Sequence, residues 1–482
     1  MPGPVVASIG SVPLFVRTKF NSFRGCACMS GFAVDRLANF MRRILLAGCC
    51  QLILVGCHSS SESEGTFEGF AAKEPTNASP IDPAAASAAR TRLADEGVDL
   101  TWSPEGPPLL WQQPMGTGYG SPVIVGDRVI ANHRVDDSER TVCFDLESGD
   151  LIWEDQIPTT AVCDYEYSDG PYSTPVVAGD EVFVHHGQGQ LSAIDWRDGR
   201  RIWHRDLYQE YQVTPGIFPA GASPLVTEDR VFLSLGGVDT DAGVIALDRA
   251  SGETIWAATD HAAAYTIPVL TRVHGNDHLL VITAEGLVSL DPTDGSVDWE
   301  IQHFGRAPLS YNAVSPVVIQ DIVLAVTGPG PGAVAVRILP DRGHERVWKD
   351  RRVLDSQFNR LVTWKDHVIG FTAAGQGGAS LRMIDPADGE LMWEYSSVLR
   401  RGQPVRVGDD IILAIGERGH LASLAIRHDG VDVLAFTDQP LMTEPSYCTP
   451  AIRGNRLVLK DEERLAVFDL SAFDPSLSTT ED

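Results

Sequence analysis

The sequence predicts an all-β protein folded as an eight-bladed β-propeller, and two repeating signals carry this prediction. The first is an eleven-residue hairpin unit, Ala246–Trp256 (ALDRASGETIW), in which Asp and Gly suit a tight turn and the second strand ends on Trp. Other copies of the same length span residues 143–153, 193–203, 289–299 and 383–393. The second signal is a proline that opens an alternating strand, with an Asp five residues later at the next turn, as at Pro122, Pro175, Pro224, Pro316 and Pro404.

The spacing of these prolines sets the number of blades. With Pro268 and Pro450 included, they recur about every 44 to 53 residues, except that Pro316 and Pro404 lie about twice as far apart. Leu361, followed by Asp366, fills the missing register between them. Eight repeats result, each with sequence for four short strands. Short strands in a repeat of this length are typical of β-propellers.

The two ends of the repeat array predict how the ring closes. The last repeat, residues 450–470, has three strands and lacks the Trp hairpin, whereas Leu109–Trp111 is an outer strand that precedes the first repeat. Pairing the two completes the eighth blade and leaves no exposed ring edge. Two copies of the hairpin deviate, because residues 337–348 carry one extra residue and residues 424–434 replace the Trp by Leu. The second deviation predicts a weak seventh blade.

The outer-strand tryptophans are expected to dock neighbouring blades onto one another. A large apolar ring with a single N–H donor suits the space between two sheets. Burial of these rings, more than local strand propensity, would then hold the ring together. The residues concerned are Trp111, Trp153, Trp203, Trp256, Trp299, Trp348 and Trp393.

Composition limits the classes of function. The chain has 482 residues, of which 43% are hydrophobic, so it can bury a large core. Its mean hydropathy of −0.05 fits a globular protein rather than one with many membrane spans. The formal net charge of −27 argues against binding to nucleic acid, whose phosphates attract basic surfaces. A solvated surface is the simpler explanation of the acidity itself.

The N-terminal segment resembles a bacterial lipoprotein signal. Arg42 and Arg43 precede an apolar run that is too short to span a bilayer and that ends in the string Leu-Val-Gly-Cys at Cys57. We therefore predict lipidation of Cys57 and location in the cell envelope. His58 after this cysteine favours a periplasm-facing outer-membrane lipoprotein. The expected start of translation is Met41 rather than Met1.

The predicted domain organisation follows from these features and from composition. Residues 1–56 are assigned to an upstream segment with the signal peptide, and residues 57–100 to a disordered linker rich in Ala, Pro and Ser. Residues 101–472 form the propeller, and residues 473–482 a disordered tail. Of the eight cysteines, Cys143, Cys163 and Cys448 fall in the propeller, and their odd number is not a disulfide framework. A single bridge between Cys143 and Cys163 is left open.

The hairpin repeat also carries a family resemblance. Its A-x-D-x-x-[ST]-G-x-x-x-W pattern resembles the blades of quinoprotein-like (PQQ-like) eight-bladed propellers over about residues 102–470. One branch of these propellers contains pyrroloquinoline-quinone (PQQ) dehydrogenases, which hold the quinone against two adjacent disulfide-linked cysteines beside a Ca²⁺ bound by Glu, Asn and Asp. Another branch contains the BamB-type outer-membrane assembly lipoproteins, which are enzymatically inactive scaffolds that bind the outer-membrane insertase.

The residues favour the second branch. The adjacent cysteines, Cys49 and Cys50, lie within the predicted signal, and no C-x-x-C-H haem motif occurs. We therefore assign no catalytic, PQQ-binding or metal-binding residues. The predicted function is a lipid-anchored envelope scaffold that binds protein partners, such as the outer-membrane assembly machinery. The alternatives are a PQQ-dependent oxidoreductase, and a sensor propeller that binds a ligand or polymer.

Two sets of aromatic residues are the candidate sites. Tyr119, Tyr172, Tyr265 and Tyr447 each stand three residues before a strand-opening proline, so they could ring one mouth of the central channel. Packing on the neighbouring blade is the simpler alternative, because a repeat architecture generates such periodicity by itself. The loops at residues 158–173 and 206–222 supply exposed aromatics suited to partner binding, unless the loops merely cap the ring. The residues predicted to bind a partner are Tyr165, Tyr167, Tyr208, Tyr211 and Phe218.

Overall fold

The computed structural model describes residues 97–163, 165, 167–305, 311–373, 378–396 and 399–471. Every described residue belongs to one unit of the chain, Lys73–Asp482. The predicted signal, the lipidated Cys57 and the C-terminal tail therefore lie outside the described residues. Within the described ranges, no helix has the length and apolar character needed to cross a membrane.

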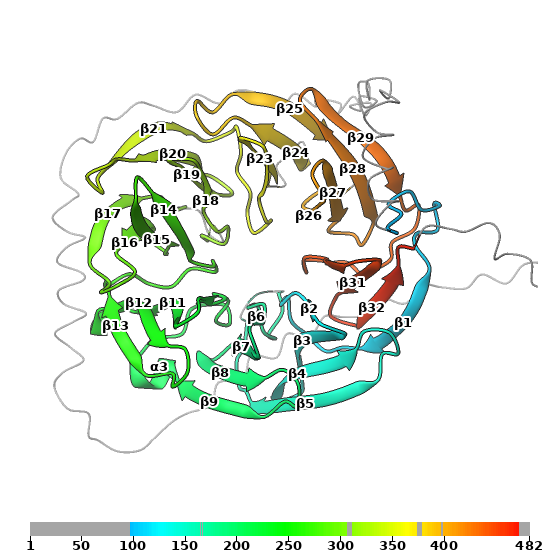
Figure 1. The fold of residues 1–482 in the computed structure, drawn as a ribbon, viewed down its shortest axis with the longest axis horizontal. Helices are drawn as coiled ribbons and strands as arrows, with labels where there is room; N and C mark the ends of the chain where they lie inside the picture. Colours follow the sequence, from blue (N-terminus) through cyan, green and yellow to red (C-terminus); the bar gives the residue numbers. More distant parts are fainter. Residues whose placement is uncertain are drawn as a thin grey trace, which may run out of the picture. The chain divides into compact units, whose positions relative to one another are not determined.

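Eight four-stranded antiparallel sheets are arranged in a ring, which confirms the predicted propeller (Figure 1). Blades 1 to 7 use consecutive strands, and each strand hydrogen-bonds the one before it. Blades 1 to 3 comprise β2 (Val123–Val125), β3 (Arg128–Val135), β4 (Ser138–Asp145) and β5 (Leu151–Pro158); β6 (Val176–Ala178), β7 (Glu181–His185), β8 (Gln190–Asp195) and β9 (Arg201–Asp206); and β10 (Leu225–Val226), β11 (Arg230–Gly237), β12 (Ala242–Asp248) and β13 (Thr254–Ala258). Two short helices, α3 (Leu207–Glu210) and η1 (Val238–Thr240), lie in connections.

The remaining blades repeat the same order. Blades 4 and 5 comprise β14 (Val269–Val273), β15 (Asn276–Ile282), β16 (Gly286–Leu290) and β17 (Val297–Gln302), followed by β18 (Val317–Ile319), β19 (Ile322–Thr327), β20 (Gly332–Ile338) and β21 (His344–Asp350). Blades 6 and 7 comprise β22 (Val362–Trp364), β23 (His367–Phe371), β24 (Ser380–Ile384) and β25 (Leu391–Ser396), followed by β26 (Gln403–Val407), β27 (Ile411–Ile415), β28 (Leu421–Arg427) and β29 (Gly430–Phe436).

Blade 8 closes the ring with a strand from the other end of the domain. Its inner strands are β30 (Ala451–Arg453), β31 (Arg456–Lys460) and β32 (Arg464–Asp469), and its outer strand is β1 (Leu109–Pro114). The register places Trp111 opposite Val467, and Figure 1 shows β1 beside β32. The predicted closure by an N-terminal strand is thereby confirmed. The ordered chain begins somewhat earlier, because Val98 and Leu100, which the sequence assigned to the linker, are buried against blades 7 and 8.

The core lies between blades. Middle strands such as β19 and β20 are buried along nearly their whole length, because both faces of each blade are covered by neighbouring blades. Outer strands alternate, and in β13 Trp256 is buried while its neighbours Ile255 and Ala257 are exposed. Cysteines 143, 163 and 448 are free, so the bridge between Cys143 and Cys163 that the sequence left open is not formed.

The hairpin turn of one blade receives the tryptophan of the blade before it. The Trp153 indole N–H donates to the carbonyl of Trp196 at 2.8 Å, and a Cβ on Gly199 would lie 2.8 Å from the Trp153 ring. The motif glycine is therefore required twice, for its positive φ of 77° and for this close approach. The same indole-to-carbonyl bond is made by Trp111, Trp203, Trp256, Trp348 and Trp393.

Trp299 is the exception among the outer-strand tryptophans. Its indole N–H is buried without a hydrogen-bond partner, and its ring lies 4.9 Å from that of His344. The turn it faces belongs to blade 5, whose hairpin carries the extra residue at 337–348. At this joint a tilted ring contact with His344 stands in place of the indole-to-carbonyl hydrogen bond.

Candidate functional site

The tyrosines that precede the innermost strands meet at one mouth of the central channel. Because each stands just before an inner strand, the ring of blades brings them to the same end, opposite the hairpin turns that receive the tryptophans. Ring centroids are 5.2 Å apart for Tyr447 and Tyr119, 5.1 Å for Tyr119 and Tyr172, and 6.4 Å for Tyr172 and Tyr265. Tyr311 continues the series at 6.0 Å from Tyr265. We call this set the aromatic mouth.

Phe218 lies within the aromatic mouth and connects it to the loop tyrosines. Its ring centroid is 5.1 Å from that of Tyr311, 5.7 Å from Tyr167 and 6.0 Å from Tyr165. Gly221 makes this packing possible, because a Cβ there would lie 2.4 Å from the Tyr265 ring. Tyr165 is 44% exposed. The structure therefore brings three of the five predicted partner-binding residues together, next to the tyrosines of the channel.

Tyr208 and Tyr211 make no ring contact with the aromatic mouth, although Tyr208 lines a second cavity together with Phe218 and Tyr265. They belong to α3 and its C-cap, and both pack on the core between blades 2 and 3. Burial raises the pKa of Tyr208 to about 12, and the Tyr211 hydroxyl is 2.6 Å from the Thr254 hydroxyl. The loop at 206–222 thus divides into a part that packs on the core and a part, around Phe218, that faces the channel. A role for these two tyrosines in partner binding stays a prediction.

Two members of the mouth were missed from the sequence. Phe358 lies 4.6 Å from Tyr447, and the Arg401 guanidinium stacks over Phe358 at 5.1 Å. Both residues occupy the same offset as the tyrosines, three residues before Leu361 and Pro404. Applying that offset to every blade, rather than to tyrosines alone, would have found them.

Arg401 is held by a buried carboxylate. It forms an ion pair with Glu417, whose side chain is 6% exposed, and the Tyr447 hydroxyl donates to Glu417 at 3.1 Å. Burial opposes ionisation of this carboxyl, but the hydrogen bond and charge of Arg401 outweigh it, so the pKa of Glu417 is lowered. Burial raises the pKa of Tyr447. At neutral pH this part of the mouth is therefore a compensated ion pair beside neutral phenols.

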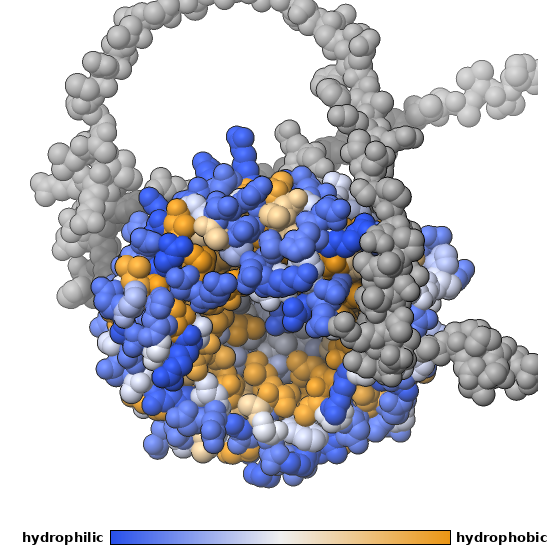
Figure 2. All heavy atoms as spheres, turned by 45° about the horizontal axis from the view of Figure 1, so that its top comes forward, coloured by the Kyte–Doolittle hydropathy of each residue, from blue (hydrophilic) through white to orange (hydrophobic). Residues whose placement is uncertain are grey.

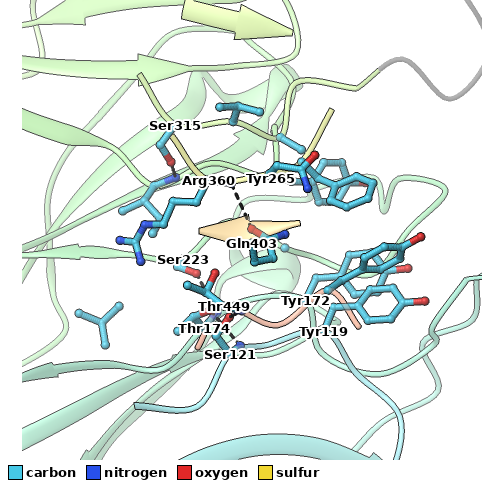
Figure 3. Close-up of a pocket in the computed structure, with 18 of the residues that line it drawn as sticks. Tyr119, Ser121, Tyr172, Thr174, Ser223, Tyr265, Ser315, Arg360, Gln403 and Thr449 are labelled. Carbon is cyan, nitrogen blue, oxygen red and sulfur yellow. Dashed lines mark hydrogen bonds between the residues drawn. The ribbon is translucent and has the colours of Figure 1, made fainter. Parts of the chain in front are cut away.

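Below the aromatic mouth, a belt of side chains links successive blades. In five of the eight blades, the residue just before the inner strand-opening position accepts a hydrogen bond from the backbone N–H of its counterpart in the preceding blade, as Figure 3 shows. Ser121 Oγ accepts from Thr449 at 2.8 Å, Thr174 Oγ1 from Ser121 at 3.1 Å, and Ser223 Oγ from Thr174 at 2.8 Å. The same bond joins Ile267 to Ser315 and Arg360 to Gln403.

The mouth and the belt enclose a central cavity of about 930 Å³. Figure 2 shows the hollow, with hydrophobic residues gathered along its wall. That wall is formed by the strand-opening prolines and by the Val, Ile and Leu residues that follow them, such as Val123 and Val176. Arg360 is the one charged residue among the described residues that line it.

His185, the last residue of β7, and the adjacent His186 are not arranged to bind one metal ion together. His185 Nδ1 contacts the carbonyl of Ala222 at 2.7 Å, whereas His186 Nδ1 lies 3.2 Å from Glu139. The two rings thus have separate partners on different elements. Across the described ranges, no group of three or more His, Cys, Asp or Glu residues is placed to hold a metal ion.

The fold and the repeat define a PQQ-like eight-bladed propeller. Comparison with known proteins shows which family of these propellers the chain matches. Residues 99–215 and 212–369 match the family model described as outer membrane protein assembly factor BamB. Because the match spans more than half of the chain, the protein belongs to this family.

Individual relatives agree with this assignment. The BamB of Alkalilimnicola ehrlichii is 28% identical over 227 residues, which are 46% of this chain and 52% of the relative. The BamB of Yersinia pestis is 30% identical over 160 residues, 33% of this chain and 36% of the relative. The alignment thus spans about half or less of the length of these relatives.

Solved structures share the fold at low sequence identity. The crystal structure of BamB from Moraxella catarrhalis superposes with a TM-score of 0.52 at 18% identity and covers 76% of this chain and 98% of that chain. Quinohemoprotein alcohol dehydrogenase from Comamonas testosteroni gives a TM-score of 0.52 at 11% identity, with 78% of each chain covered. At such identities the likeness concerns the fold alone.

The residues of the channel do not fit the quinone site of the dehydrogenase branch. That site needs adjacent cysteines and carboxylate ligands for Ca²⁺, whereas the described lining residues include no Cys, Asp or Glu. The adjacent pair Cys49 and Cys50 lies outside the described residues. No redox chemistry is therefore assigned to the channel.

Proposed function

We propose that the protein is a lipid-anchored scaffold of the cell envelope that binds protein partners in outer-membrane protein assembly. Membership of the BamB family supports the setting. The observation that carries the binding role is the aromatic mouth with Phe218, Tyr165 and Tyr167 beside it. Membership of the same family motivates the proposed partner, a component of the outer-membrane assembly machinery.

The physical case for protein binding rests on the chemistry and rigidity of this surface. Tyrosine and phenylalanine offer large contact areas at low entropic cost, and such residues dominate the energetics of protein interfaces. The channel tyrosines stand a few residues before inner strands of the rigid ring, so they lose little conformational freedom on binding. Tyr165 at 44% exposure and Ile217 at 39% give the surface accessible apolar area.

Site-specific photo-cross-linking in intact cells tests the binding surface. A photoreactive residue at Tyr165 is expected to capture a defined envelope protein, identified by mass spectrometry. Leu151, which is 55% exposed on the outer strand β5, is the matched control and should capture no such product. Equal products from both positions, or none from Tyr165, would contradict the proposal. Tyr165→Ala should weaken recovery of the same partner without changing the melting temperature.

The lipid anchor needs a separate test, because Cys57 lies outside the described residues. Cys57→Ser should abolish incorporation of labelled palmitate and release the protein from the membrane fraction. Cys49→Ser is the control, since Cys49 ends a second, weaker string of the same kind, Leu-Ala-Gly-Cys. Loss of labelling in the Cys49 variant alone would place the anchor there instead.

A further inference from the structure

The charge of Arg360 has no counterpart inside the channel. The other residues at its position in the repeat are uncharged: Ser121, Thr174, Ser223, Ile267, Ser315, Gln403 and Thr449. Arg360 is exposed, and among the described residues no carboxylate lies within ion-pair distance of it. The chain has a net charge of −27, and arginines such as Arg342 and Arg401 form ion pairs with acids. The guanidinium of Arg360 differs from these because it faces the channel without such a partner in the described part of the chain.

The structural role of Arg360 is carried by its backbone, not by its guanidinium. Its N–H donates to Gln403 Oε1 at 3.1 Å and so continues the belt. The side chain breaks the belt in the other direction, because a guanidinium has no acceptor atom. Figure 3 shows it extending into the open space of the cavity, away from Tyr119 and Tyr172.

The surrounding hydroxyls can donate to an anion at the same depth. Ser223 and Ser315 accept backbone N–H groups at 2.8 Å, and each keeps its own O–H hydrogen for a further partner. Thr174 and Thr449 line the same space. A guanidinium fork with several O–H donors is the chemistry that binds a carboxylate, since each donor satisfies one of its lone pairs.

We propose that the channel binds a single carboxylate at Arg360, carried by a slim peptide segment whose uncharged part leaves through the aromatic mouth. One guanidinium balances one negative charge, and the apolar wall would desolvate any excess charge at high cost, which disfavours a dianionic phosphate. A cavity of about 930 Å³ has the size of sites that hold ligands of a few residues. The tyrosine rings suit peptide planes and apolar side chains. This inference rests on the channel and does not require the envelope partner.

Two blocked peptides test the charge requirement by calorimetry on the full chain. Acetyl-Phe-Ala-Ala with a free C-terminal carboxylate is expected to bind at least about tenfold more tightly than the same peptide with a C-terminal amide. Arg360→Gln should remove this difference. Arg453→Gln, which deletes an exposed arginine of the inner strand β30 that does not line the cavity, should preserve it. Arg360→Lys should keep part of the preference, which separates charge from folding.

A third peptide, acetyl-Phe-Ala-Glu amide, distinguishes the source of the carboxylate. Binding comparable to the free acid supports an acidic side chain as the ligand, and weak binding supports a chain end. Equal affinity of the acid and amide forms for the wild type, a preference that survives Arg360→Gln, or no binding of any peptide would each overturn the proposal. Because cross-linking at Tyr165 reports on the outer surface, the two proposals can fail independently.

Discussion

Gly199 shows how one residue of the repeat serves two blades. Its positive φ forms the turn of its own hairpin, and the absence of a Cβ admits the ring of Trp153 from the blade before. Gly252, Gly295 and Gly389 stand in the same relation to Trp203, Trp256 and Trp348. The glycine of the motif is therefore as much an interface residue as the tryptophan.

A pair of glycine variants separates these two roles. Gly199→Ala should cost the strain of a positive φ plus the displacement of Trp153, roughly 2 to 4 kcal/mol together. Gly275→Ala has a similar φ of 84° but nothing within 4 Å of the added Cβ, so only the strain of about 1 kcal/mol applies. Urea unfolding measures both values. Equal losses would show that the tryptophan contact contributes nothing.

His133 links the segment that follows β1 to β3. Its Nδ1 accepts a hydrogen bond from the Gly116 N–H at 2.7 Å, so the ring is neutral at this atom. Burial, with the nearby charges of Lys460 and Arg140, lowers the pKa of His133 from 6.5 to about 4. Protonation would break the hydrogen bond and place a charge beside two cations.

The sign of the resulting pH dependence follows from linkage. The unfolded chain binds a proton at pH values where folded His133 does not, so stability is fully present above about 6.5 and is lost as the pH falls towards 4. The loss is up to roughly 3 kcal/mol. His133→Asn, whose amide oxygen can accept from Gly116, should show a shallower acid loss in denaturant titrations at pH 7, 5.5 and 4.5. His185 and His303 contribute to both proteins alike, so identical profiles would exclude His133 as a contributor.

At this scale the sequence predicted residues that obey the repeat and missed those that depart from it. The four channel tyrosines could be located from their offset to proline, and the same offset counted from Leu361 and Pro404 leads to Phe358 and Arg401, which a search for tyrosines alone overlooks. Arg360 is invisible to a search for motifs, since its significance is the absence of a neighbouring acid. Tyr208 and Phe218 share one loop in sequence but have different neighbours, because Tyr208 lies in α3 and packs on the core between blades 2 and 3, whereas Phe218 contacts the channel tyrosines.

Among the elements, β1 carries the largest share of the closure. It covers the outer edge of β32, and its Trp111 indole donates to Leu146 of blade 1 at 2.9 Å. The strand therefore both completes blade 8 and docks it on blade 1. The sequence predicted this element because Leu109–Trp111 is an outer strand without a repeat of its own, and the last repeat has three strands and lacks an outer one.

Deleting residues 108–114 should lower the melting temperature by roughly 10 °C or more, because the deletion removes a ladder and a docked indole and exposes an edge strand. Deleting residues 66–90, in the predicted linker, should lower it by less than about 2 °C. Scanning calorimetry on the two proteins gives the comparison. Similar melting temperatures would mean that blade 8 is stable with three strands.

The whole molecule behaves as a ring whose ends meet. Val98 and Ser471 form a β-bridge, and the Asp99 N–H donates to the carbonyl of Leu470 at 2.6 Å. The described chain therefore starts and stops at one place on the ring. A chain that began at another blade and joined the present ends could form the same ring.

Circular permutation tests this equivalence. Joining residues 98 and 471 by a short linker and opening the exposed turn at Gly275 should leave the melting temperature within a few degrees, because nothing packs on that turn glycine. Opening the turn at Gly252 instead should destabilise the protein markedly, since Trp203 docks there. Comparable stability of the two permutants would mean that a tryptophan docks equally well on a turn whose backbone has been opened.

The belt below the aromatic mouth has a consequence for how the ring comes apart. It runs unbroken from Thr449 through Ser121 and Thr174 to Ser223, and so crosses the junction between blades 8 and 1. It stops at Ile267 and Arg360, whose side chains supply no acceptor, and among the described residues no such bond joins the Gln403 N–H to Thr449. The junction between blades 8 and 1 is thus linked by the belt on its inner side and by the Trp111 indole on its outer side, whereas, in the part of the chain that the structure describes, the junctions between blades 3 and 4, 5 and 6, and 7 and 8 lack the belt bond. Amide protons near the termini should therefore exchange with solvent among the slowest, the reverse of the fraying that chain ends ordinarily show.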